Sequence, residues 1–143
     1  MNRLEQLGVY DAILDYATTH IGENGGILEL RCGGGDFAEF LSKKGVKNYN
    51  GVDSDVDALK NAKSRLPIFK RRFKKSWRNQ KSDIIVCLNG TPFDQITTGS
   101  RMAVLTGGFD DYNKLIAAIS PLYKPGSKTV QHGEFFLTFG VRA

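Results

Sequence analysis

The sequence predicts an α/β fold in which a mostly parallel, doubly wound sheet has helices on both faces. Short apolar segments of strand length alternate with segments whose apolar residues recur at helical spacing, which is typical of parallel strands joined by crossover helices. Residues 83–88 (Asp-Ile-Ile-Val-Cys-Leu) are apolar after the first position, as in a strand buried on both faces. The turn-rich end of the chain indicates that the last strand is antiparallel.

The first elements are a helix, a strand and a second helix. Apolar residues at i, i+3, i+4 and i+7 spacing predict an amphipathic helix over residues 3–20, which the glycines of 22–26 end. Residues 27–30 are a short buried strand. Residues 36–44 are the next helix, and it stops near Gly45 because glycine readily adopts the conformation that terminates a helix.

A second strand over residues 46–53 leads into a third helix. Asp55 or Ser54 caps this helix, which runs to Arg65 and ends before a proline. Residues 68–77 mix aromatic and basic side chains, and their spacing fits a twisted edge strand or a basic helix. We favour the strand.

The second half continues the alternation. Residues 91–100 are a loop or short helix, 101–106 a strand and 110–122 a helix. Residues 124–127 (Lys-Pro-Gly-Ser) are predicted to form a turn. The chain closes with a strand over residues 134–142.

Val130 is expected to pair with this last strand across Gly133.

The length of 143 residues is that of one ordinary domain with a core of its own. Residues 1–143 are therefore expected to form a single domain.

The composition is that of a globular protein. Hydrophobic residues make up 41% of the chain and charged residues 24%, which excludes a disordered chain. No apolar run approaches the roughly 18 residues of a membrane span, so no membrane partner is expected. The N-terminus lacks the features of a secretory signal, and two cysteines, Cys32 and Cys87, are no disulfide framework. A reduced, cytoplasmic protein is expected.

The positive charge is concentrated in one segment. The net charge is +5, and residues 70–81 hold seven basic residues and no acid. Subtracting those seven charges leaves about −2 for the rest. The cations of this segment are interleaved with Phe69, Phe73 and Trp77. Proteins bind single-stranded nucleic acid with such a combination, because cations neutralise the phosphates and bases stack on aromatic rings. The alternative is a solvated segment whose aromatic side chains face the core. The candidate nucleic-acid contacts are Lys70, Arg71, Arg72, Lys74, Lys75, Trp77 and Arg78.

The most informative stretch covers residues 27–53. A short apolar run enters three consecutive glycines, Gly33 to Gly35, and a helix follows. The next strand ends on Asp53, about 20 residues later. Glycines let a ligand approach the backbone, and a carboxylate at the tip of the second strand accepts hydrogen bonds from ribose hydroxyls. The pattern predicts a site for a nucleoside-containing ligand.

This stretch resembles one family in particular. It is similar to the Rossmann-like (class I) S-adenosylmethionine-dependent methyltransferases. Their acid-x-Gly-x-Gly-x-Gly loop corresponds to residues 28–35 (Leu-Glu-Leu-Arg-Cys-Gly-Gly-Gly). Their second strand, which ends in an acid, corresponds to residues 51–54 (Gly-Val-Asp-Ser), followed by Ala58-Leu59. Residues 83–89 resemble that family's fourth strand. The resemblance covers about residues 10–110 and implies a Rossmann-like fold, a minimal core domain and S-adenosylmethionine as the cofactor.

The resemblance also implies roles for single residues. Glu29 would hold the methionine amino group, Asp53 the ribose hydroxyls, and Asn89 would lie near the amino acid end of the cofactor. The implied cofactor-binding residues are Glu29, Arg31, Cys32, Gly33, Gly35, Asp53, Ser54 and Asn89. Each of the three side-chain roles has an alternative: Glu29 pairs with Arg31 or caps a helix, Asp53 caps the helix after it, and Asn89 bonds its own turn.

Two features depart from the family's pattern. Arg31 stands where the family has its first glycine; either its side chain points away and the loop still works, or it fills part of the pocket. The family commonly places an acid or amide against the adenine after its third strand, and residues 73–77 supply none. Trp77 either stacks on the adenine or belongs to the core.

Methyl transfer mainly requires alignment, with a base only where the acceptor must lose a proton. The family therefore has no universal catalytic residue, and none is assigned. Amino-methylating members that act on nucleic acids or glutamine have an Asn/Asp-Pro-Pro-aromatic loop after the fourth strand. Here residues 89–93 read Asn-Gly-Thr-Pro-Phe, with altered spacing. His20 and His132 stand alone, so no metal site is expected.

The leading hypothesis is an S-adenosylmethionine-dependent methyltransferase acting on nucleic acid, RNA or DNA, ahead of protein or small-molecule acceptors. The alternative is a catalytically degenerate binding or assembly module of the same fold, attached to RNA through residues 70–81. Arg31 and the missing adenine contact motivate this alternative. A nicotinamide-dependent oxidoreductase fits less well, because no proton donor or substrate half is evident.

Overall fold

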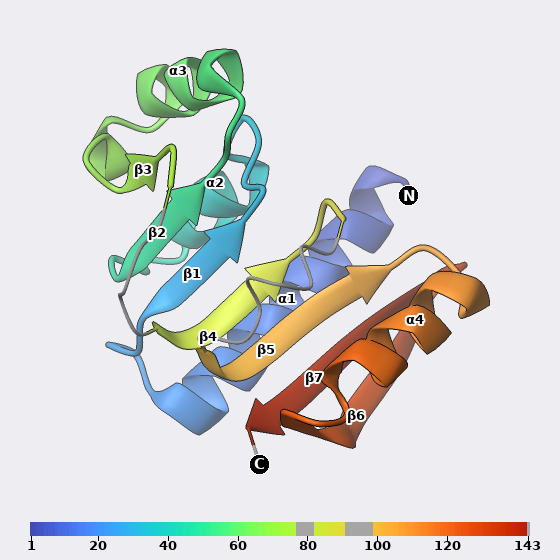
Figure 1. Ribbon diagram of the computed structural model, residues 1–143. Coiled ribbons are helices and arrows are strands. Elements are labelled where there is room, and N and C mark those ends of the chain that lie inside the picture. Colours follow the sequence, from blue (N-terminus) through green and yellow to red (C-terminus); the bar gives the residue numbers. More distant parts are fainter. Residues whose placement is uncertain (77–81, 91–98, 143) are drawn as a thin grey trace.

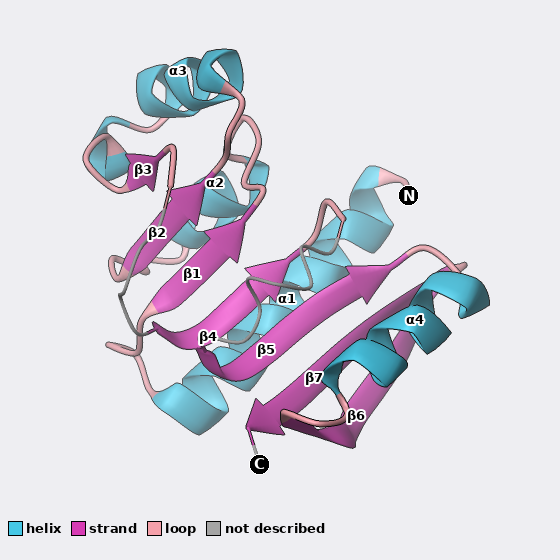
Figure 2. Cartoon of the chain, in the orientation of Figure 1, coloured by secondary structure: helices cyan, strands magenta, loops and turns pink. Residues whose placement is uncertain are grey.

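The computed structural model of the protein describes residues 1–76, 82–90 and 99–142, with the backbone alone for residues 125–128. Helices and strands alternate through most of the chain (Figures 1 and 2). In chain order the elements are α1 (Arg3–Ile21), β1 (Ile27–Leu30), α2 (Asp36–Lys43), β2 (Tyr49–Val52), α3 (Val56–Arg65), a 3-10 turn (Pro67–Phe69), β3 (Phe73–Lys74), β4 (Ser82–Cys87), β5 (Gly99–Thr106), α4 (Phe109–Ile119), β6 (Tyr123–His132) and β7 (Phe135–Arg142).

The described strands form one seven-stranded sheet in the order β3-β2-β1-β4-β5-β7-β6. Strands β3, β2, β1, β4 and β5 are parallel to one another, while β7 is antiparallel to both β5 and β6. The predicted mostly parallel sheet with an antiparallel C-terminal strand is confirmed. In the register, Leu30 lies opposite both Val52 and Cys87. The carboxyl ends of β1, β2 and β4 therefore meet at one edge of the sheet.

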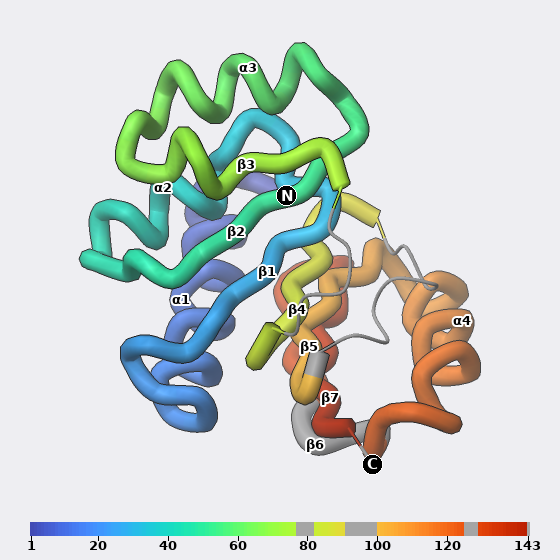
Figure 3. Tube along the Cα trace, turned by 60° about the vertical axis from the view of Figure 1, so that its left-hand side comes forward, coloured from blue at the N-terminus to red at the C-terminus, as the bar shows by residue number. Residues whose placement is uncertain are grey.

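Two apolar cores lie on the two faces of the sheet. Helices α1 and α2 cover one face and α4 covers the other (Figure 3). In β4, Ile84 and Val86 pack on the α1 side, while Ile85 and Cys87 pack on the α4 side. Side chains alternate in this way because successive residues of a strand point to opposite faces. This confirms the prediction of a central strand buried on both faces.

The elements around the glycines agree with the sequence pattern. Asp55 is the N-cap of α3, and its carboxylate accepts hydrogen bonds from the backbone N–H groups of Asp57 (3.0 Å) and Ala58 (3.2 Å). The helix ends with Arg65, two residues before Pro67. Of the two cap candidates, the aspartate rather than Ser54 has this role.

The segment after α3 is less regular than the predicted strand. It makes a 3-10 turn and then only two residues of β3. Phe69 and Phe73 are buried, with ring centroids 5.2 and 5.9 Å from that of Tyr49. Burial of these two rings, rather than a regular alternation of buried and exposed side chains, determines the conformation of the segment. Residues 77–81 and 91–98 lie outside the described parts of the chain.

The predicted turn at residues 124–127 is wrong. Strand β6 continues from Tyr123 to His132, with an irregular register between Lys124 and Lys128. A bulge on an edge strand accommodates a proline, which has no N–H to donate. The turn between β6 and β7 lies instead at Gly133, whose φ is 61°, and the predicted pairing of Val130 with the last strand is confirmed.

Candidate functional site

The loop after β1 turns sharply by means of three residues with positive φ. These are Arg31 (54°), Gly33 (59°) and Gly35 (93°). A Cβ on Gly35 would lie 3.1 Å from the Leu66 side chain and 3.3 Å from Cβ of Ala62. The backbone conformation therefore favours glycine, and the close approach of α3 leaves little room for a larger residue. Gly35 is also the N-cap of α2 and supplies no side chain to the first turn of that helix.

Asp53 ties the tip of β2 to this loop. One oxygen of its carboxylate accepts a hydrogen bond from the backbone N–H of Gly33 (2.8 Å), and the other accepts one from Asp55 (2.9 Å). Each carboxylate oxygen has a second lone pair, so the group can still accept hydrogen bonds from a diol. The structure thus gives Asp53 a local structural role at the position predicted to bind ribose.

Arg65, at the end of α3, holds the same loop from the other side. Its guanidinium donates hydrogen bonds to the carbonyl oxygen of Gly34 (2.9 Å) and to the Asp36 carboxylate (3.0 Å), and pairs with Glu39 of α2. The hydrogen bond with Asp36 and then that with Glu39 raise the pKa of Arg65. Sequence reasoning missed this residue, because a cation in the last turn of a helix is common for other reasons.

Glu29 lies under the loop with only 1% of its surface exposed. The hydroxyl of Tyr49 donates a hydrogen bond to its carboxylate at 2.6 Å. Burial raises the pKa of Glu29 to about 8; the Tyr49 hydrogen bond opposes this rise, and the carboxylates of Asp36 and Asp53 add to it. Neither Arg31 nor a helix cap satisfies this carboxyl, so both alternatives for Glu29 are wrong. Tyr49 was missed because its tip is buried beside a residue 20 positions away.

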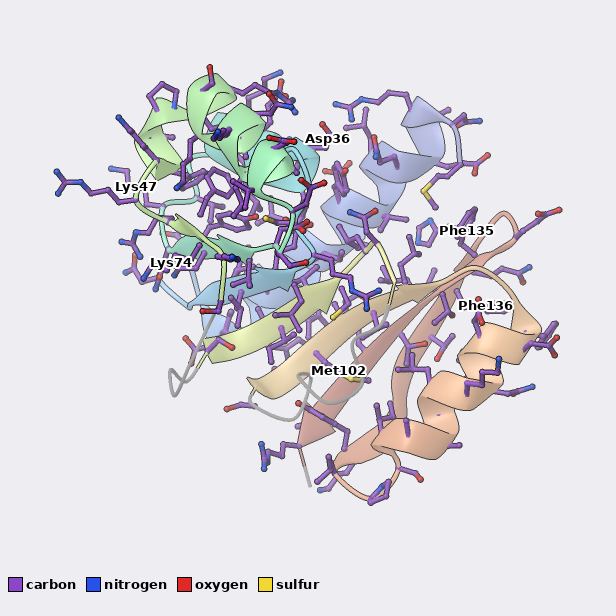
Figure 4. All side chains as sticks on the ribbon, turned by 45° about the horizontal axis from the view of Figure 1, so that its top comes forward. Asp36, Lys47, Lys74, Met102, Phe135 and Phe136 are labelled. Carbon is purple, nitrogen blue, oxygen red and sulfur yellow. The ribbon has the colours of Figure 1, made fainter. Side chains whose placement is uncertain are left out.

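A hollow opens above Glu29 at the carboxyl edge of the sheet. Of the predicted cofactor-binding residues, Glu29, Cys32, Gly33 and Asn89 line it, together with Gly34. Its wall is completed by Met1, Gln6, Val9, Tyr10, Asp36, Phe37, Leu88, Leu105 and Phe135. Asp36 begins α2, which follows β1, whereas Phe135 begins β7, three strands further along the sheet (Figure 4). We call this the first hollow.

Arg31, Gly35, Asp53 and Ser54 are not among the described residues that line the first hollow. The exposed Arg31 side chain lies against Gly90, where an added Cβ would overlap the guanidinium. The Asn89 amide donates a hydrogen bond to the Arg31 carbonyl oxygen at 3.2 Å. Arg31 therefore points toward the end of β4 and does not fill the first hollow.

A second hollow adjoins the first. The two share Leu88, Leu105 and Phe135, and the second is completed by Gly90, Thr106, Gly107, Asp111 and Lys114. The shared apolar residues form a divide between two spaces at the ends of β4 and β5. Such an arrangement suits two ligands, one in each hollow, that meet at the divide.

The two cysteines are free and buried. Burial raises the pKa of both thiols, that of Cys87 to about 12. Both thiols therefore remain protonated near neutral pH and are poor nucleophiles. In the described parts of the chain, no three His, Cys, Asp or Glu side chains gather as metal ligands would.

Five of the predicted nucleic-acid contacts are exposed around β3: Lys70, Arg71, Arg72, Lys74 and Lys75. We call them the basic edge. Lys74 and Lys47 lie at one end of the molecule and Phe135 at the other (Figure 4). The idea that Phe69 and Phe73 stack on bases is wrong, because both rings are at most 2% exposed. Trp77, Arg78 and residues 91–93 lie outside the described residues.

Taken together, the strand order, the glycine loop after β1 and the acid at the tip of β2 define a Rossmann-like α/β protein. No protein-family model and no curated protein matches the sequence. Solved structures do match. One is the methyltransferase domain of bacterial CtHen1-C, with 13% identity over 99% of this chain and 100% of that chain and a TM-score of 0.75.

Two other similar structures are enzymes of named organisms. Magnesium protoporphyrin IX methyltransferase (ChlM) from Synechocystis PCC 6803, with bound S-adenosylmethionine, is 13% identical over 99% of this chain and 81% of that chain, with a TM-score of 0.72. N-methyltransferase NodS from Bradyrhizobium japonicum WM9 is 13% identical over 99% of this chain and 98% of that chain, with a TM-score of 0.74. The chain has the fold of the class I S-adenosylmethionine-dependent methyltransferases.

No helix within the described residues combines the length and the apolar character needed to cross a membrane.

Proposed function

We propose that this protein is an S-adenosylmethionine-dependent methyltransferase. The observation that carries the proposal is the buried Glu29 carboxyl facing a hollow that is bounded by a glycine loop, with Asp53 tied to that loop. A carboxyl group in an apolar setting favours a cationic ligand, and the methionine part of the cofactor has an ammonium group. The similar ChlM structure, which contains S-adenosylmethionine, supports the proposal.

The residues present fit such a cofactor. Glu29 would hold the ammonium group, and the backbone of Cys32 and Gly33 would lie along the methionine and ribose. Asp53, placed by its two backbone hydrogen bonds, would accept the ribose hydroxyls. Asn89 would fix the amino acid end, since it lines the first hollow and bonds the loop carbonyl. Ser54 and Gly35 would act through the conformation of their loops.

When bound, the cofactor supplies a methyl group activated by a sulfonium centre. The chain would contribute alignment of the two reactants, which alone provides large rate enhancements. Leu88, Leu105 and Phe135 form an apolar divide between the two hollows and would exclude water there. No general base is assigned, because the need for one depends on the acceptor.

Calorimetry with S-adenosylhomocysteine tests the binding part of the proposal. Asp53→Ala should weaken binding at least about fivefold, since it removes two acceptors for the ribose. Asp57→Ala is the matched control, because Asp57 is exposed on the first turn of α3. Absence of heat from the unaltered protein at millimolar ligand would contradict the proposal.

For the acceptor, we propose nucleic acid. The basic edge supports this choice, because exposed cations without interspersed acids attract a phosphate backbone. Charge removal at Arg71 and Arg72 should weaken binding to a single-stranded oligonucleotide and flatten its dependence on salt. Unchanged affinity would favour a protein or small-molecule acceptor instead.

The expectation of a reduced, cytoplasmic protein stays a prediction.

A second candidate function is a degenerate binding module of the same fold. Arg31 favours it, because a residue with a bulky side chain has replaced glycine at a positive φ. Arg31→Gly separates the two candidates. If the substitution creates affinity for S-adenosylhomocysteine that the unaltered protein lacks, the arginine blocks the site and the module hypothesis holds. Equal affinity in both proteins supports the enzyme.

A further inference from the structure

We propose that the Arg31 guanidinium binds a phosphate group of the methyl acceptor at the boundary between the two hollows. The inference rests on the proposed function and adds to it a residue that recognises the acceptor. The relevant observations are the backbone conformation of Arg31, the direction of its side chain, and the charges around it.

The backbone of Arg31 is held in an unfavourable conformation. Its φ of 54° is the only positive value among the described residues other than glycine, and the left-handed region is sterically unfavourable for a residue with a Cβ. The Asn89 side chain holds this conformation through the Arg31 carbonyl oxygen. Strain of this kind persists where the surroundings enforce it, and it clusters at functional positions.

The side chain of Arg31 contacts the rim of the second hollow, although Arg31 itself lines neither hollow. The Arg31 guanidinium lies against Gly90, which lines the second hollow and not the first. A Cβ at position 90 would overlap the guanidinium where it now lies, so the Arg31 side chain would have to move aside. The guanidinium thus lies beside the loop that follows β4, two residues along the chain from Leu88 of the divide, where an acceptor would approach the transferred methyl group.

Arg31 has no salt bridge with any carboxylate of the described residues. The nearby acids have other partners: Glu29 accepts from Tyr49, and Asp53 accepts from the backbone of Gly33 and Asp55. A guanidinium presents a planar fork of donors that matches a phosphate. An anionic ligand would supply the partner that the described chain does not.

The charges along the carboxyl edge favour a phosphodiester chain. Lys74 ends β3, two strands from Arg31, or about 10 Å at 4.8 Å per strand. Beyond Arg31, Lys114 of α4 lines the second hollow, with Asp111 one turn before it. Asp111 disfavours a phosphate beside itself, whereas Arg31 and Lys114 attract one. The basic edge and Arg31 would then contact successive parts of one single strand.

The experiment compares the unaltered protein with Arg31→Gln, which keeps a long side chain and the same backbone strain. Anisotropy of a labelled single-stranded 12-nucleotide RNA reports phosphate binding. Calorimetry with S-adenosylhomocysteine and methylthioadenosine reports the cofactor site, because the second compound lacks the amino acid part. Lys124→Gln is the charge-matched control, since exposed Lys124 lies at the start of β6, at the opposite edge of the sheet.

Arg31→Gln should weaken RNA binding about threefold to tenfold and reduce the slope of log affinity against log salt by about 0.7, the value for one lost contact to a single strand. Affinity for both nucleosides should change less than about twofold. Lys124→Gln should leave all three affinities unchanged. A 12-mer of the same sequence with an uncharged backbone should bind both proteins equally.

Three results would overturn the proposal. Loss of S-adenosylhomocysteine affinity with unchanged methylthioadenosine affinity would show that Arg31 holds the cofactor carboxylate. Unchanged RNA affinity, or no RNA binding by the unaltered protein, would show that Arg31 contacts no phosphate. Failure of the proposed function looks different: neither nucleoside would bind the unaltered protein, whatever happens with RNA.

Discussion

Glu29 is the residue whose chemistry the fold alters most. Its carboxyl is buried, and burial raises its pKa from 4.5 to about 8. Since the folded protein then binds a proton that the unfolded chain releases above pH 4.5, folding is favoured at low pH. This contribution is complete below pH 4.5 and is lost as the pH rises through about 8.

Glu29→Gln should therefore flatten the pH dependence of stability. Between pH 5 and 8 the free energy of unfolding of the unaltered protein should fall, by at most about 1.4 kcal/mol per pH unit from this group. Denaturant titrations at several pH values measure it, with the exposed Glu134→Gln as the control. A variant that keeps the full slope would show that Glu29 ionises normally.

The Glu29 carboxyl should also couple cofactor binding to the release of a proton. At pH 7 Glu29 is mainly protonated in the free protein, because its pKa is about 8, and an ammonium group beside it would favour the ionised form. Binding of S-adenosylhomocysteine at pH 7 should then release up to one proton. Calorimetry in two buffers of different ionisation enthalpy measures this release, and identical heats in both would count against contact between Glu29 and the ammonium group.

Among the elements, α3 has the most specific link to the site. It touches the glycine loop through Arg65 at its end and through Ala62, whose Cβ faces Gly35. This contact fixes the loop between β2 on one side and α3 on the other, since Asp53 bonds Gly33 and Arg65 bonds Gly34.

Arg65→Ala should weaken S-adenosylhomocysteine binding about threefold to tenfold while leaving the fold intact, because the loop would lose its carbonyl partner and sample other conformations. The exposed Lys60→Ala, on the same helix, is the control. Calorimetry together with thermal unfolding decides the matter: a drop in stability without a change in affinity would give Arg65 a purely structural role.

The sequence predicted those elements whose signals are local. Apolar spacing, an N-cap aspartate and glycines next to one another were sufficient for α1, β1, α2 and α3. Strands β3 and β6 were predicted poorly, since β3 is defined by pairing with β2 and β6 continues through Pro125 by pairing with β7. Tyr49 and Arg65 were missed for the same reason: their partners lie 20 and 26–31 positions away. The role of Arg31 likewise depends on Gly90, which no local pattern connects to it.

At the scale of the whole molecule, the two ends of the sheet differ. The basic edge surrounds β3, while both hollows extend across β4, β5 and β7. A ligand in the first hollow would join the ends of β1 and β4 to the N-terminal part of α1. Binding there should stabilise the entire fold rather than a surface loop.

At a concentration of about 100 times its dissociation constant, S-adenosylhomocysteine should add about 2.7 kcal/mol to the free energy of unfolding. For a chain of this size that corresponds to a rise in Tm of about 5–10 °C. Asp53→Ala should lose about a third of the rise or more at the same ligand concentration, because a fivefold weaker affinity leaves about 1.8 kcal/mol of stabilisation. A rise that is equal in both proteins would place the ligand elsewhere.

The most direct measurement is a crystal structure of the protein soaked with S-adenosylhomocysteine. We expect the ligand in the first hollow, with its ribose hydroxyls on the Asp53 carboxylate, its amino group within reach of Glu29, and the Arg31 side chain still turned toward Gly90. Ligand density at another surface, or a first hollow without ligand at millimolar concentration, would contradict this expectation.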